Sequence, residues 1–177
     1  NKILTAVPKE RQTMLFSATM PHDIMNIATK HMKMPVRIEV APQGTAAERV
    51  AQEIFMVRKE DKSRLLLALL EEEKGTVLVF SRTKHGARKL TKLLRASTHG
   101  AAELHADRSQ AQRKEALDGF KGGRYRILVA TDIAARGIDV TGISLVVNFD
   151  LPQNSEDYVH RIGRTARAGR EGKAVSF

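Results

Sequence analysis

The chain has 177 residues and a formal net charge of +10, from 30 lysines and arginines against 20 aspartates and glutamates. This basic balance favours a polyanionic partner, nucleic acid first, but it does not specify a fold. The absence of cysteine excludes disulfides and thiolate metal sites and favours a reducing compartment such as the cytoplasm. No apolar run approaches the roughly 18 residues of a membrane span, and no signal peptide is visible, so we expect no membrane partner.

Short β-rich runs alternate with helical patterns along the chain. Several of these runs are continuously apolar, as expected for strands buried on both faces of a parallel sheet. The predicted strands are residues 13–16, 36–40, 53–57, 76–80, 126–130, 144–149 and 174–177. The predicted helices are residues 63–73, 86–96 and 109–120, the last opened by a capping box of Ser109 and Gln112. The alternation predicts an α/β fold with a parallel sheet and crossover helices.

The composition divides the chain at residues 41–50, which carry proline, glycine and small side chains between two strand patterns. This favours a linker, with a surface loop as the alternative. Residues 1–40 are too short to fold with a core of their own, whereas residues 51–177 are long enough for a domain. The sequence opens without methionine and stops within an apolar run, so we expect it to be a piece of a longer protein.

The segment HRIGRTARAGR, residues 160–170, places four arginines three residues apart. A helix over residues 156–167, capped by Ser155, turns by about 100° per residue. The residues that then fall within a sector of about 60° are His160, Arg164 and Arg167, with Arg161 pointing elsewhere. Such a group suits a phosphate or polyphosphate, because arginine is a rigid and permanently charged donor. A solvated basic face or an ion-pair network is the alternative interpretation.

Polar loops at strand ends and helix starts supply further candidates, since α/β folds bind ligands at the carboxyl ends of their strands. Loop amides and side chains at these positions suit a backbone phosphate or a ribose hydroxyl. The candidates are Thr83, Gln110, Arg113, Thr131, Asp132 and Asp139. The alternative is that Asp132 and Asp139 cap a short helix and a turn, and that the basic residues are solvated.

Taken together, these segments resemble the DEAD-box RNA helicases of helicase superfamily 2. The matching segments are SAT at 17–19 (motif III), VLVFSRTKHGA at 77–87 (motif IV), QAQR at 110–113 (the Q-x-x-R element), ATDIAARGID at 130–139 (motif V) and HRIGRTAR at 160–167 (motif VI). They follow the family order and spacing over nearly the whole chain, and their sequences resemble those of bacterial members. SAT alone carries no weight, whereas the last two segments together are highly specific.

The resemblance implies a RecA-like fold, a parallel sheet flanked by helices on both faces in three layers. Residues 1–40 would be the end of the first RecA-like domain, 41–50 the interdomain linker, and 51–177 most of the second domain. The activity it implies is local unwinding of RNA coupled to hydrolysis of ATP with Mg²⁺. The partners it implies are RNA, ATP and the first RecA-like domain of the same protein.

The resemblance also implies roles for individual residues. Arg164 and Arg167 would be arginine fingers at the γ-phosphate of ATP, with Gly137 and Asp139 beside the nucleotide. The residues that would hold the RNA sugar-phosphate backbone are Thr83, Gln110, Arg113 and Thr131. The residues that would couple the two domains are Ser17, Thr19, His160 and Arg161.

Two departures and two absences qualify the resemblance. Ala106 and Ala166 stand where the family usually has glycine, and Ala106 could weaken a close approach of RNA or backbone. The chain contains neither a G-x-x-x-x-G-K-[ST] loop nor a D-E-A-D segment, so we expect no metal ligands here and no activity from this chain alone. A stand-alone RNA-binding module is the alternative, and a DNA translocase of the same superfamily is a third, less favoured reading.

Overall fold

The computed structural model describes residues 2–17, 20, 22–38, 50–135, 140–166 and 171–177. Contacts within the chain divide it into two units, Asn1–Gln43 and Gly44–Phe177. The predicted linker lies, except for Val50, outside the described residues, so its assignment stays a prediction. No helix in the described ranges is long and apolar enough to cross a membrane.

The smaller unit contains two helices, α1 (Lys2–Ala6) and α2 (His22–His31). The strand predicted at 13–16 does not form, and residues 36–38 of the next predicted strand are also not in a strand, while 39–40 are not described. A single strand is unstable without neighbours to pair with, and none pairs with these segments in the described part of the chain. Their side chains are accordingly exposed, Phe16 to 85% and Ile38 to 82%.

The larger unit is built on a sheet that, within the described residues, has six strands in the order β1-β6-β5-β2-β4-β3. All the strand pairs are parallel. The strands are β1 (Val50–Ile54), β2 (Val77–Phe80), β3 (Ala101–Leu104), β4 (Ile127–Ala130), β5 (Leu145–Asn148) and β6 (Gly172–Ser176). The helices are α3 (Lys62–Glu72), α4 (Lys84–Ala96), α5 (Gln110–Lys121), α6 (Asp132–Ala135) and α7 (Ser155–Ile162).

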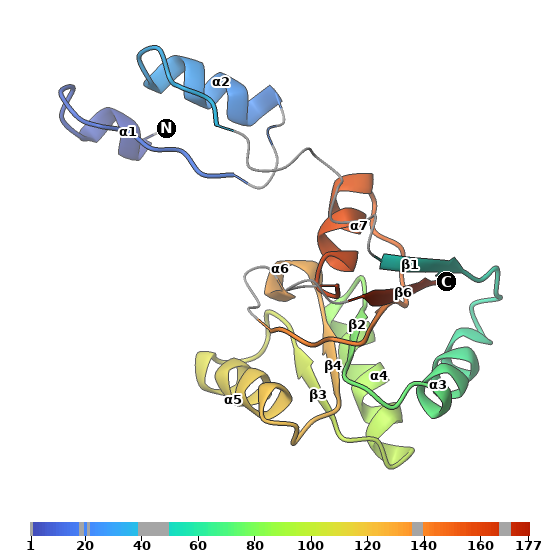
Figure 1. Cartoon of the computed structure of the whole chain (residues 1–177). Helices are drawn as coiled ribbons and strands as arrows, with labels where there is room; N and C mark the ends of the chain where they lie inside the picture. Colours follow the sequence, from blue (N-terminus) through green and yellow to red (C-terminus); the bar gives the residue numbers. More distant parts are fainter. Residues whose placement is uncertain (1, 18–19, 21, 39–49, 136–139, 167–170) are drawn as a thin grey trace. The chain divides into compact units, whose positions relative to one another are not determined.

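Helices cover both faces of this sheet, and Figure 1 shows α5 and the pair α3 and α4 on opposite sides of the strands. On one face, Leu66 of α3 and Leu94 of α4 pack against Val77 and Val79. On the other face, helices α5, α6 and α7 pack against the residues of β2 that alternate with these. Strands β2, β4 and β5 are therefore buried on both sides, which explains their continuously apolar sequences. The predicted three-layer α/β/α fold is confirmed.

Two local predictions need correction. Helix α7 begins one residue earlier than expected and ends at Ile162, with Gly163 as its C-cap, instead of continuing to 167. Its N-cap is Asn154, whose side chain accepts a hydrogen bond from the Asp157 amide at 2.7 Å, and not Ser155. By contrast, the capping box of Ser109 and Gln112 at the start of α5 is present as predicted.

Candidate functional site

The candidate residues lie along one edge of the sheet because the strands are parallel and in register. Asn148, Phe80, Ala130 and Leu104, the last residues of β5, β2, β4 and β3, are aligned across neighbouring strands. The segments that follow these strands therefore leave the sheet side by side, at intervals of about 4.8 Å. They carry α7 after β5, Thr83 after β2, Thr131 after β4, and Gln110 after β3. The fold thus places motifs far apart in sequence along one line.

At the β5 end of this edge lies a small cavity of about 20 Å³. Its walls are Phe80, Asp132, Ala135, Asp157, His160, Arg161 and Arg164. The cavity is partly open to solvent, so the arginine group lines a small hollow at the surface of the larger unit.

Arg161 is the buried centre of this cavity wall, with only 2% of the residue exposed. Its guanidinium donates to both carboxylate oxygens of Asp132, at 2.5 and 2.8 Å, and to the Asn148 side chain at 3.1 Å. It also donates to the Asp150 carbonyl at 2.6 Å and lies over the Phe80 ring, 4.9 Å from its centroid. The helical-face argument set Arg161 apart from His160 and Arg164, whereas the structure brings all three to one cavity.

His160 and Arg164 share this cavity although Arg164 lies beyond the end of α7. Arg164 Nε donates to the carbonyl oxygen of His160 at 3.3 Å, so the turn after the helix returns the arginine toward the histidine. His160 Nε2 is buried and makes no hydrogen bond within the described part of the chain. This imidazole nitrogen thus has no hydrogen-bond partner among the residues that the structure describes.

Several predicted site residues cannot be placed relative to this cavity. Thr19, Gly137, Asp139 and Arg167 lie outside the described residues. Ser17 is described and exposed, but it belongs to the smaller unit. The structure therefore leaves the roles of these five residues as predictions.

At the β2 end, Thr83 caps α4 at the surface. Its side-chain oxygen accepts a hydrogen bond from the Gly86 amide at 3.0 Å, and its own hydroxyl proton can still be donated to a ligand. A Cβ on Gly86 would lie 2.5 Å from Ser81 Oγ and 3.2 Å from Thr83 Oγ1, which accounts for glycine at this position. The first turn of α4 thus presents a hydroxyl and backbone amides at the sheet edge.

The two neighbouring strand ends complete this side of the edge. Gln110 is the exposed first residue of α5, and Arg113 follows one turn later, partly exposed. Within the described residues their side chains make no hydrogen bond or ion pair, so both can reach a ligand. Thr131 lies between them and Thr83, directly after β4, and its amide donates to the Leu104 carbonyl at 3.2 Å. Ala106 is exposed, so a methyl group here faces solvent.

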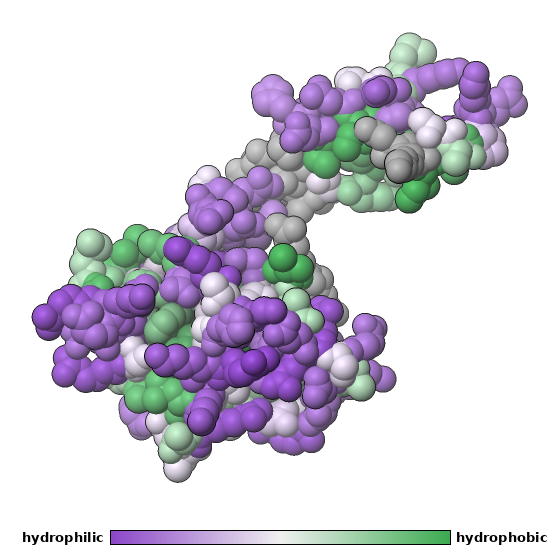
Figure 2. Space-filling model, turned by 180° about the vertical axis from the view of Figure 1, so that it is seen from behind, coloured by the Kyte–Doolittle hydropathy of each residue, from purple (hydrophilic) through white to green (hydrophobic). Residues whose placement is uncertain are grey.

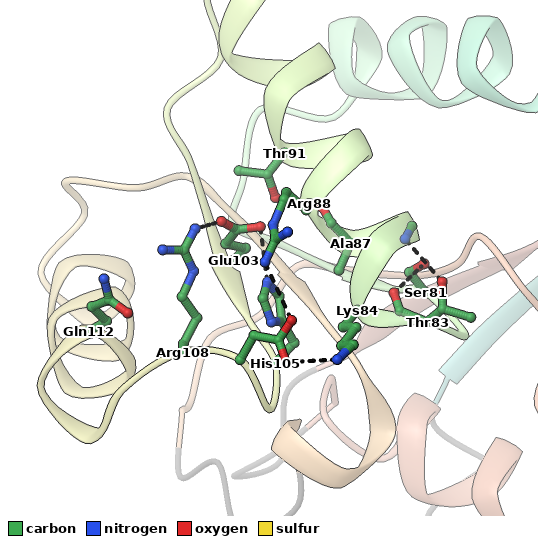
Figure 3. A network of polar contacts seen from close by, with 12 residues as sticks. Ser81, Thr83, Lys84, Ala87, Arg88, Thr91, Glu103, His105, Arg108 and Gln112 are labelled. Carbon is green, nitrogen blue, oxygen red and sulfur yellow. Dashed lines mark hydrogen bonds and ion pairs between the residues drawn. The ribbon is translucent and has the colours of Figure 1, made fainter.

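A carboxylate that the sequence did not single out joins the β2 and β3 loops. Asp107 accepts a hydrogen bond from Lys84 at 2.9 Å and forms an ion pair with Arg88 at 3.5 Å. The hydrogen bond from Lys84 lowers the pKa of Asp107 below its ordinary value. Figure 3 shows Lys84 and Arg88 projecting from α4 toward the segment that carries His105. The spacing of Lys84 and Arg88, one helical turn apart, was the available signal.

Beneath this ion pair lies a buried polar chain on the edge strand. His105 is fully buried, and its Nε2 lies 3.2 Å from Glu103, which also pairs with Arg108. Burial, followed by the positive charge of Arg88, lowers the pKa of His105 and favours the neutral imidazole. His105, Glu103 and Arg108 therefore support the loop that leads to Gln110, with His105 and Glu103 buried and Arg108 partly exposed.

No group of three or more histidine, aspartate or glutamate side chains in the described ranges could hold a metal ion. The chemistry that the edge offers is therefore anion binding, by arginine side chains at one end and by helix N-termini and hydroxyls at the other.

Comparisons with known proteins agree with this arrangement. A family model described as the helicase conserved C-terminal domain matches residues 61–169. The ATP-dependent RNA helicase DbpA of Bacillus subtilis is 44% identical over 176 residues, covering 99% of this chain and 37% of the relative. The ATP-dependent RNA helicase RhlB of a Shewanella species is 46% identical over 169 residues, covering 95% and 38%. The chain thus spans well under half the length of these relatives.

Solved structures show the same similarity. The DEAD-box protein SrmB of E. coli, bound to the regulator of ribonuclease activity A, is 40% identical with a TM-score of 0.67, covering 72% of this chain and 75% of that one. Dbp5 of S. cerevisiae, bound to RNA and ADP BeF3, is 32% identical with a TM-score of 0.87, covering 99% of this chain and 47% of that one.

Proposed function

Because the chain belongs to the helicase conserved C-terminal domain family, in the form found in DEAD-box proteins, we propose that residues 51–177 are the second RecA-like domain of an ATP-dependent RNA helicase. Residues 1–40 are then the end of the first RecA-like domain and 41–50 the linker between them. The relatives DbpA and RhlB are ATP-dependent RNA helicases, which supports the same activity for the protein that contains this chain. The solved complex of Dbp5 with RNA supports RNA as the substrate.

The observation that carries the proposal is the division of one sheet edge into two anion-binding ends. The end at β5 presents His160, Arg161 and Arg164 around a small hollow at the surface. The end at β2, β4 and β3 presents Thr83, Thr131, Gln110 and Arg113. A protein that couples nucleotide state to RNA needs both kinds of site on one rigid body, and the in-register strands supply that body.

At the nucleotide end, the proposed roles divide between buried and accessible groups. Arg164, together with Arg167, reaches the γ-phosphate of an ATP bound to the first domain and neutralises the charge that develops during transfer. Arg161 is a positioning residue, because its guanidinium is fully engaged by Asp132, Asn148 and Asp150. Gly137 and Asp139 contact the nucleotide sugar in this proposal.

The remaining parts of the nucleotide site belong to the first domain in this proposal. The sequence has no P-loop and no D-E-A-D segment, so the residues that cradle the triphosphate and hold Mg²⁺ come from outside this chain. His160, whose Nε2 lacks a hydrogen-bond partner in the described residues, and Ser17 and Thr19 link the two domains. ATP and RNA then close the domains onto each other, and the closed state completes the site.

At the RNA end, helix N-termini and short side chains bind the sugar-phosphate backbone. The caps of α4 and α5 direct backbone amides at a phosphate, and Arg113 adds a charged donor. Contacts of this kind fix the position of a strand but carry little sequence information, so we expect weak sequence preference. In the closed state the edge holds one strand in a bent path that its duplex partner cannot follow, which separates the strands locally.

The test of this function is the substitution Arg164→Ala in a protein that includes the first RecA-like domain. We expect RNA-stimulated ATP hydrolysis to fall by about a thousandfold or more, in line with the loss of an arginine finger, while RNA affinity changes little. Arg64→Ala, at an exposed position on α3, is the matched control and should leave hydrolysis unchanged. Normal hydrolysis by the Arg164→Ala variant would rule out the arginine-finger assignment.

A stand-alone RNA-binding module is the second candidate. The observation in its favour is that the whole RNA end of the edge, from Thr83 to Arg113, lies within the larger unit. This alternative predicts tight, salt-sensitive RNA binding by the chain alone. The helicase proposal predicts weak binding until the first domain is present.

A further inference from the structure

The outer face of α4 carries basic residues that the proposed RNA site does not use. Its exposed residues include Lys84, His85, Arg88, Lys89, Lys92 and Arg95, and the helix contains no acidic residue. The opposite face, with Ala87, Leu90, Thr91 and Leu94, is buried against the sheet. Helices α3 and α5 differ, because both mix acidic with basic residues on their exposed faces. We call the exposed basic residues of α4 the basic ridge.

Only part of this charge is neutralised within the structure. Asp107 pairs with Lys84 and Arg88 in the first turns, and Arg95 Nε donates to the carbonyl of Ala101. Lys89 and Lys92 make no hydrogen bond or ion pair within the described residues. Glu71 of α3 pairs with His99, just beyond the end of α4, at 3.8 Å.

The basic ridge begins at the proposed RNA site and leads away from it. Thr83 caps α4 at the sheet edge, and the helix then runs along the sheet face to Ala96. From Lys84 to Lys92 the helix rises about 12 Å, which is long enough to contact more than one phosphate of a strand that lies along it. A strand held at the edge could therefore continue along α4 with its phosphates near successive cations.

The composition of the basic ridge favours RNA over a protein partner. Protein interfaces depend on buried aromatic and apolar anchors, and among the exposed residues of α4 the one apolar side chain is Ala96. Figure 2 shows hydrophilic side chains over most of one face of the larger unit. Long, flexible cations without apolar neighbours are typical of contacts to a phosphate backbone.

We propose that the basic ridge binds the phosphate backbone of the RNA segment that leaves the sheet edge, with Lys89 and Lys92 as the principal contacts. This inference rests on the proposed function, because the edge must hold RNA for a continuing segment to exist. Lys84 and Arg88, held in place by Asp107, form the junction between the edge and the ridge. The ridge lengthens the RNA site and raises affinity for longer strands without adding sequence preference.

The test compares two double variants that remove equal charge. Lys89→Ala/Lys92→Ala alters the ridge, and Lys59→Ala/Lys74→Ala removes two exposed lysines outside α4. Binding by the 177-residue chain is measured with oligouridylates of about six and about twenty nucleotides, over a series of salt concentrations. For the long RNA, we expect the ridge variant to bind about five- to tenfold more weakly, with a salt slope reduced by about 1.4.

The short RNA and the control variant separate the outcomes. We expect the short RNA, held at the sheet edge alone, to bind both variants as it binds the unmodified chain. Equal effects of the ridge and control variants on the long RNA would overturn the inference, and so would an equal loss for short and long RNA. Weak binding of both RNAs by the unmodified chain is expected to strengthen when the first RecA-like domain and ATP are added. If neither RNA binds even then, the proposed function fails and the ridge fails with it.

Discussion

At the scale of single residues, Arg161 joins three parts of the site through one guanidinium. It uses Nε, Nη1 and Nη2 to bind Asp132, Asn148 and the Asp150 carbonyl, and it lies over Phe80. Three differently directed contacts require the planar fork of arginine, and a lysine ammonium cannot reproduce them. This arrangement makes Arg161 primarily a structural support for the cavity wall.

We therefore expect Arg161→Lys to lower the free energy of unfolding by about 2–3 kcal/mol, because it leaves the buried Asn148 side chain and the half-buried Asp132 carboxylate without donors. Urea denaturation followed by circular dichroism measures this change. Arg88→Lys, at a half-exposed ion pair, should cost less than about 0.5 kcal/mol. A similar, small effect for both variants would show that the Arg161 contacts contribute little.

At the scale of elements, the turn after α7 decides where Arg164 lies. Gly163 ends the helix, and Ala166 then adopts φ +55°, in the left-handed region that disfavours side chains with a Cβ. The position at which the family usually has glycine is thus one where the backbone of this chain suits glycine. The sequence alone showed the departure but not the conformation that makes it costly.

Ala166→Gly should accordingly stabilise the protein, by about 0.5–1 kcal/mol, because glycine adopts positive φ without steric cost. Ala68→Gly, at an exposed position within α3, should instead destabilise it by about 1 kcal/mol. Thermal unfolding of the two variants checks the opposite signs. A loss of stability in Ala166→Gly would mean that the packing of the alanine methyl group outweighs its strained backbone.

The same scale shows what the sequence could and could not predict. The sequence predicts β2, β4 and β5 because strands that are buried on both faces are continuously apolar. It also predicts the capping box of α5, which requires only two residues. Strand β3 was missed, because Ala-Ala-Glu-Leu lacks β-branched side chains and depends on pairing with β4. The regular arginine spacing predicts a helix that continues to residue 167, but Gly163 ends α7 earlier.

The common sheet edge of the described motif residues was predictable from the sequence, whereas the contacts among them were not. The motif residues that the structure describes in the larger unit do lie on one sheet edge, as expected for strands in a parallel sheet. The ion pairs of Arg161 with Asp132 and of Asp107 with Lys84 and Arg88 join segments 19 to 29 residues apart. The spacing of Lys84 and Arg88 indicates a shared face of α4 but not their partner, since such pairs arise only when the strands are aligned.

At the scale of the whole molecule, the proposal requires a second body. In the proposed function, catalysis depends on closure of the small β5-end cavity against a domain that carries the P-loop. The larger unit has its own two-sided core. In this proposal, the core belongs to the larger unit alone, whereas catalysis requires two domains.

This separation predicts complementation between chains. We expect no RNA-stimulated ATP hydrolysis from the 177-residue chain alone, and measurable hydrolysis when it is mixed at high concentration with a separately produced first RecA-like domain. A phosphate-release assay with and without RNA measures both, and Arg164→Ala in this chain is the negative control. Firm RNA binding by the chain alone, with no hydrolysis in the mixture, would favour the binding-module alternative.

The in-register sheet also leaves an opposite edge, at the amino ends of the strands, that carries none of the candidate residues that the structure describes in the larger unit. Gly123 lies there, in the turn before β4, with φ +78° and no heavy atom within 4 Å of the position a Cβ would take. A cysteine inserted next to Gly123, which itself keeps its positive φ, can carry a fluorescent dye in a chain that has no other cysteine to label. With a second dye on a separately produced first RecA-like domain, energy transfer between the two dyes would report domain closure.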